Sequence, residues 1–91
     1  MDYKVRYRFE NVRKNFKLTH DNFSCVMFSN MGDSPAEVQN IILQPGESVS
    51  FNEDPTVYIE TDFVIKFFQD LISDNPLIVI TCSYYERIKH C

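Results

Sequence analysis

The stretch IILQPGESVSF, residues 41–51, places a Pro-Gly pair between two apolar runs. Proline has its φ angle preset for the second position of a turn, and glycine supplies the positive φ that the third position of a type II turn requires. Type II turns splay the strands that flank them, whereas tight hairpins prefer the mirror-image turns. We therefore predict that residues 44–47 form a corner between the two layers of a β-sandwich. Val49 and Phe51 then enter the core by alternation.

The first segment of the chain alternates strictly between two kinds of residue. The apolar set is Tyr3, Val5, Tyr7 and Phe9, and the charged set is Lys4, Arg6, Arg8 and Glu10. Alternation with a period of two is typical of a half-buried strand. We expect the apolar set to lie in the core and the basic row to point outward.

Further short apolar segments, separated by turn residues, follow along the chain. Residues 16–18 are a short candidate strand, and residues 23–28 (FSCVMF) are dense enough for a central strand buried on both faces. The segment SNMGDSP, residues 29–35, is rich in turn residues. Residues 77–85 (LIVITCSYY) predict a further strand.

Residues 57–72 fit two patterns. The alternation over residues 57–68 predicts one long strand, and this pattern accounts for Ile65 and for the β-branched and aromatic content. The same segment also has an apolar helical face, with Asp62 as its N-cap. We prefer the strand, followed by a short helical turn near residues 69–74, and a short helix around residues 62–74 stays as the alternative.

A chain of 91 residues builds a single domain, residues 1–91, because it has room for only one core. The count of six to eight short strands predicts a mainly β protein, a single small antiparallel β-sandwich or jelly-roll-like domain. No apolar run is long enough to cross a bilayer, and the start lacks the apolar stretch of a signal peptide. We therefore expect that the protein does not contact a membrane and that it is made in a cytoplasm.

The residue types that perform catalysis or bind metals do not form a recognisable constellation. His20 and Cys25 could be a base and a nucleophile, but Cys25 lies in an apolar run where a thiolate is disfavoured. His90 and Cys91 lack the further ligands that zinc needs. The acidic pairs Glu60 with Asp62 and Glu53 with Asp54 lack the spacing of a calcium loop. We expect no enzyme, and no catalytic, cofactor or metal site.

The net charge of −4 is unevenly distributed. Residues 1–20 hold six basic and two acidic residues, a balance of +4, whereas residues 21–91 have a balance of −8. Aromatic and basic residues interleave at the start, as in single-strand binders, but on a strand they would point to opposite faces. Direct nucleic-acid binding is therefore disfavoured. The basic row would instead meet acids such as Glu60 or Asp62, or an acidic partner, and the strand could join a neighbour's sheet edge.

The runs VMFSNMGDSPAEVQNIILQPGESVSF, VYIETDFVIKFF and LIVITCSYY, within residues 23–85, resemble the small β-sandwich accessory proteins of tailed-bacteriophage virions, such as capsid decoration and auxiliary proteins. A similar arrangement of strands occurs in cupins, but the chain lacks their histidine-rich metal motif. The resemblance implies a non-enzymatic structural protein in the virion. It would bind and stabilise the capsid or another virion component, in many copies, after assembly in the host cytoplasm.

Two parts of the chain are the candidate partner-binding residues. They are the basic row Lys4, Arg6 and Arg8, and the corner residues Pro45, Gly46 and Glu47. The alternative function is a soluble intracellular binding module, for instance an acidic inhibitor that occupies the basic groove of a host nucleic-acid-binding protein.

Overall fold

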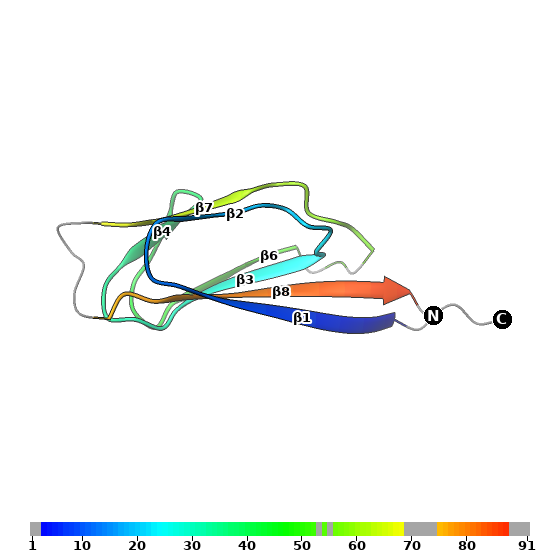
Figure 1. Ribbon diagram of the computed structural model, residues 1–91, viewed down its shortest axis with the longest axis horizontal. Helices are drawn as coiled ribbons and strands as arrows, with labels where there is room; N and C mark the ends of the chain where they lie inside the picture. Colours follow the sequence, from blue (N-terminus) through cyan, green and yellow to red (C-terminus); the bar gives the residue numbers. More distant parts are fainter. Residues whose placement is uncertain (1–2, 53, 55, 69–74, 88–91) are drawn as a thin grey trace.

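Two antiparallel sheets of four strands each pack together as a small β-sandwich (Figure 1). The computed structural model describes residues 3–52, 54, 56–68 and 75–87. The strands are β1 (Tyr3–Val12), β2 (Phe16–Leu18), β3 (Cys25–Asn30), β4 (Ala36–Val38), β5 (Ile41–Leu43), β6 (Ser48–Phe51), β7 (Phe63–Phe67) and β8 (Ile78–Arg87). The first sheet has the order β1-β8-β3-β6, and the second has the order β2-β7-β4-β5. The predicted fold class is confirmed.

Within those described ranges the chain is entirely strand, turn and loop, and none of it forms a helix of the length and apolarity that a bilayer crossing requires. The alternative helix over residues 62–74 is wrong for its first part, because Phe63–Phe67 is strand β7. Its second part, residues 69–74, lies outside the described residues.

Aromatic side chains join the two sheets across the core. The ring of Phe28 on β3 lies 5.2 Å from the ring of Phe63 on β7, and Phe51 on β6 lies 4.9 Å from the same Phe63 ring. Ile78 and Ile80 of β8 are fully buried beside them. Burial of such large apolar side chains is the main favourable contribution to the folding of this domain.

The corner predicted at residues 44–47 is confirmed. Strand β5 belongs to the second sheet and strand β6 to the first, so the chain changes layers between them. Gly46 has a φ of 90°, and the Glu47 amide donates to the Gln44 carbonyl at 2.9 Å. Val49 and Phe51 then pack against the core, as their alternation predicted.

A buried asparagine fixes this corner to the first sheet. The Asn30 side-chain amide donates to the carbonyls of Ser34 and Leu43, both at 2.9 Å, and its oxygen accepts from the Gly32 amide at 3.1 Å. Because Asn30 ends β3 and Leu43 ends β5, this side chain links the two layers. The Asn30 carbonyl also accepts from the Gly46 amide at 2.8 Å.

The predicted long strand through residues 57–68 is only partly correct. Strand β7 covers Phe63–Phe67, where the burial alternates as predicted: Phe63, Ile65 and Phe67 are buried, while the intervening residues are exposed. Residues 57–62 form no strand, although Ile59 packs against the core and its amide bonds to the Phe23 carbonyl.

The orientation predicted for β1 is wrong. Its apolar residues face solvent, with exposed fractions of 36% for Tyr3, 41% for Val5, 53% for Tyr7 and 66% for Phe9. The reason is the register with β8, in which Val12 lies opposite Ile78, and both are buried. Since side chains alternate along a strand, even-numbered residues of β1 share the inner side with Val12, and odd-numbered residues point outward.

Strand β3 is also less buried than predicted. Val26 and Phe28 point into the core, but Met27 is 41% exposed and Cys25 is half-buried on the opposite face. The strand is central in its sheet, between β8 and β6, yet only one of its faces is covered by the second sheet.

Candidate protein-contact surface

The outer face of the first sheet is the side that points away from the core. We call it the outer face, and the pairing registers assign to it Tyr3, Val5, Tyr7, Phe9 and Asn11 from β1, Val79, Thr81, Ser83 and Tyr85 from β8, Cys25, Met27 and Ser29 from β3, and Ser48 and Ser50 from β6. Arg87 continues the face beyond Tyr85, opposite Tyr3, and its side chain lies outside the described part.

Apolar side chains of β1 form the most prominent part of this outer face. The rings of Tyr7 and Phe9 stack on each other, with 6.2 Å between their centroids and 26° between their planes. Residues i and i+2 of one strand lie on the same side of a sheet, which brings these two rings together. Beside them, Tyr7, Met27 and Tyr85 border a shallow hollow of about 290 Å³ that reaches Cys25 and Ser50.

None of the described side chains of the outer face carries a formal charge. The outward face of the second sheet provides a comparison within the same molecule. There Lys17 lies opposite Val64, and Glu37 lies between Lys66 and Ile42. The second sheet therefore has the mixed polar and apolar surface of a solvated face, whereas the described side chains on the outer face of the first sheet are uncharged and Arg87 lies only at its end.

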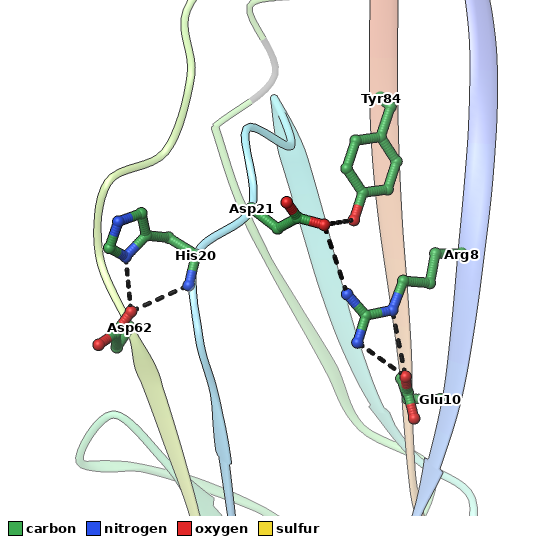
Figure 2. Close-up of polar contacts among 6 residues, drawn as sticks. All are labelled: Arg8, Glu10, His20, Asp21, Asp62 and Tyr84. Atoms are coloured by element: carbon green, nitrogen blue, oxygen red, sulfur yellow. Dashed lines mark hydrogen bonds and ion pairs between the residues drawn. The ribbon is translucent and has the colours of Figure 1, made fainter.

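The basic row of β1 lies on the inner side, where Arg8 is held by the protein's own acids (Figure 2). The guanidinium of Arg8 donates to Glu10 Oε1 from Nη2 at 2.8 Å and from Nε at 3.1 Å. A second acid, Asp21, lies 3.9 Å from Arg8 Nη1 and accepts a hydrogen bond from the Tyr84 hydroxyl at 3.2 Å. Arg8 is therefore occupied within the chain, and it is the least available member of the predicted row.

The other two basic residues remain accessible near the end of the β1–β8 strand pair where β1 begins and β8 ends. Lys4 Nζ lies 3.5 Å from Glu86, and both side chains are largely exposed. The Arg6 guanidinium lies over the Tyr84 ring, 5.0 Å from its centroid, in a cation–π contact. Both cations line a groove of about 490 Å³ that also includes Asn22, Tyr58, Tyr84 and Glu86.

The expected contact of the basic row with Glu60 or Asp62 is wrong. Asp62 instead accepts from the His20 amide at 2.9 Å and lies 2.7 Å from His20 Nδ1 (Figure 2). It also pairs with Lys17 at 3.6 Å. The hydrogen bonds from the His20 backbone and side chain, together with Lys17, lower the pKa of Asp62 below its ordinary value. This group connects the loop after β2 to the start of β7.

The corner residues Pro45, Gly46 and Glu47 are exposed, but they lie far from the basic row. The corner bonds to Asn30 at the end of β3, whereas Lys4 and Arg6 pair with the opposite end of β8. The carboxylate of Glu47 accepts from the Gln44 amide at 2.6 Å, so it stabilises its own turn. The predicted partner-binding residues therefore occupy two separate ends of the sandwich.

The candidate nucleophile and base are not brought together. His20 bonds to Asp62, while Cys25 lies on the outer face of the first sheet. Cys82 lies in the core, where burial raises the pKa of its thiol and disfavours the reactive thiolate. The described residues contain no group of three or more metal-binding side chains, and His90, Cys91 and Glu53 lie outside them.

The outer face escaped sequence reasoning because alternation alone does not say which of two sides is inward. One signal was present. Val12 continues the even-numbered row of Lys4, Arg6 and Arg8, and an apolar residue in that row indicates the side that enters the core.

The chain matches no protein-family model, and no curated protein or solved structure is significantly similar to it.

Proposed function

We propose that this protein is a non-enzymatic structural component of a virus particle, as its resemblance to phage accessory proteins implies. It binds the capsid or another virion component through protein–protein contacts, and it does so in several copies. The observation that carries the proposal is the outer face, whose described side chains are uncharged and on which four apolar residues of one strand are exposed. A soluble monomer seldom leaves such a contiguous apolar surface uncovered.

The basic end of the β1–β8 strand pair, with Lys4 and Arg6, supplies the second contact. Lys4 and Arg6 line an open groove with Tyr58 and Tyr84, a combination that suits an acidic segment with an aromatic or apolar residue. Exposed cations contribute modest affinity individually, so attachment depends on repetition of the same contact around a symmetric particle. Arg8 and the corner residues contribute by holding β1 and the turn in fixed geometry.

The test uses particles prepared from cells that produce the protein, which are sedimented through a density gradient. The proposal expects the chain to travel with the particles and to be released by raised salt. A Lys4→Ala/Arg6→Ala variant should be lost from the particle band, whereas Lys14→Ala/Lys66→Ala, which removes the same charge elsewhere, should remain. A chain that stays at the top of the gradient overturns the proposal.

The alternative function rests on the balance of −8 over residues 21–91, which could imitate a polyanion. In that case the chain stays at the top of the gradient together with a basic host protein, and excess nucleic acid displaces it from that protein. The same experiment therefore separates the two functions.

A further inference from the structure

We infer that the outer face of the β1-β8-β3-β6 sheet is the interface between two copies of this chain, which pack face to face as a symmetric dimer. The inference rests on the proposed function, since it names what covers the surface that carries that proposal. The particle is then bound by Lys4 and Arg6, which lie on the inner side of the β1–β8 strand pair.

The outer face is large enough for a small protein–protein interface. Its strands contain 10, 10, 6 and 4 residues. With about 3.3 Å per residue and about 4.8 Å between strands, their flat area is roughly 480 Å². The flat area of the two faces together is therefore about 1,000 Å², without the additional area of the protruding side chains. This reaches the lower limit for a specific interface. The exposed rings of Tyr3, Tyr7 and Phe9 supply the large apolar contacts that such interfaces use.

The charge distribution favours a second copy as the occupant. In a two-fold symmetric dimer the same patch lies on both sides of the contact, so a patch with charges of one sign would bring like charges together. The described side chains of the outer face carry no charge, Arg87 lies only at its end, and Ser29, Ser50 and Thr81 supply neutral hydroxyl groups beside the aromatic residues. The outward face of the second sheet instead carries Lys17, Lys66 and Glu37.

Packing through the face is favoured over pairing through the open edge of β1. If two β1 strands paired antiparallel along most of their length, Arg6 would lie opposite Arg8 of the other copy, or Arg8 opposite itself. Like charges directly opposite each other destabilise a strand pair. Charged residues on an edge strand are a common protection against such pairing.

The experiment is sedimentation equilibrium of the purified full chain at about 100 µM, where an interface with a Kd of about 10 µM is mostly dimeric. The wild type should have twice the 10.8 kDa mass of one chain. Tyr7→Glu/Phe9→Glu should raise the dissociation constant at least about tenfold, because it places like charges at the centre of the contact. Ile42→Glu is the matched control: Ile42 is 53% exposed, as Tyr7 is, but it lies on the second sheet.

A second variant, Met27→Glu, changes the same face from β3 and guards against a folding defect in the double variant. A circular-dichroism spectrum identical to that of the wild type shows that each variant is folded. A monomeric wild type, or a dimer that both face variants leave intact, overturns the inference. A monomer that still sediments with particles leaves the proposed function in place, whereas a dimer that binds no virion component contradicts that function and retains the inference.

Discussion

Val12 of β1 lies directly opposite Ile78 of β8, and both side chains are buried in the core. This pair determines which side of β1 faces inward. Because the side chains of a strand alternate, Arg8 falls on the inner side with Val12, and Tyr7 and Phe9 fall on the outer face. The exposed apolar surface of this protein therefore follows from a single pairing register.

Two phenylalanines test this orientation directly. Phe28 is fully buried against Phe51 and Phe63, so Phe28→Ala should lower the free energy of unfolding by about 3–5 kcal/mol. Phe9 is 66% exposed, so Phe9→Ala should cost less than about 1 kcal/mol. Urea unfolding, at a dilution that keeps the chain monomeric, measures both. Equal losses would mean that Phe9 is buried.

The buried amide of Asn30 is expected to stabilise the link between the two layers. Asn30→Ala leaves the carbonyls of Ser34 and Leu43 without their donor, so it should lower the free energy of unfolding by at least about 2 kcal/mol. Asn11→Ala, at an exposed position of β1, should change that free energy by no more than about 0.5 kcal/mol. Matching stabilities for the two variants would contradict the role given to Asn30.

The two glycines should respond differently to the same substitution. A Cβ at Gly32 would lie 2.5 Å from the Asn75 oxygen and from the Leu77 nitrogen, so the backbone must move. A Cβ at Gly46 meets no atom within 4 Å, and only its φ of 90° opposes alanine. Gly46→Ala should therefore cost about 1–2 kcal/mol, and Gly32→Ala should cost more. Thermal unfolding of both variants gives the order, and a larger loss at Gly46 would be inconsistent with the close approach at Gly32.

The Asp62 carboxylate should make stability depend on pH in acid. Its pKa is lowered in the folded state by the hydrogen bonds from His20 and by Lys17. A group with a depressed folded pKa stabilises the fold above its unfolded pKa, about 3.9, and this contribution is lost as the pH falls through the folded value. Asp62→Asn should therefore be less stable than the wild type at neutral pH.

The same comparison at low pH completes this test. The difference between Asp62→Asn and the wild type should shrink as the pH falls below about 4, because the wild-type carboxyl then becomes neutral. Glu60→Gln is the control, because it removes a carboxylate at an exposed position two residues away and leaves the bonds between Asp62 and His20 in place. A gap between Asp62→Asn and the wild type that is constant with pH would contradict the assigned pKa shift.

Local sequence signals were sufficient for most of the fold. The Pro45-Gly46 pair identified the corner because its φ requirements are specific to one turn type, and the alternation around Ile65 identified the side of β7 that is buried. The register of β1 against β8 pairs residues that lie 66 (Val12 and Ile78) to 84 (Tyr3 and Arg87) positions apart, so the alternation of residues 3–10 alone could not decide it, and Val12 was the local sign of the inward side.

The candidate contact surface was harder to predict than the fold for the same reason. Lys4, Arg6 and Arg8 looked equivalent along the strand, but Arg8 alone lies within reach of both Glu10 and Asp21. Met27 joins Tyr7 on the outer face through β8, which lies between their strands. Such neighbours are fixed by strand order, which the sequence pattern does not contain.

The central claim is that another protein surface covers the outer face when this protein functions. Hydroxyl-radical footprinting, read by mass spectrometry, measures this on Tyr7, Phe9 and Met27, with Ile42 on the second sheet as an exposed reference. We predict that oxidation of the three outer-face residues falls severalfold between the dilute chain and the concentrated or particle-bound chain, while oxidation of Ile42 falls less. Equal oxidation of Tyr7, Phe9 and Met27 in all states would contradict the account.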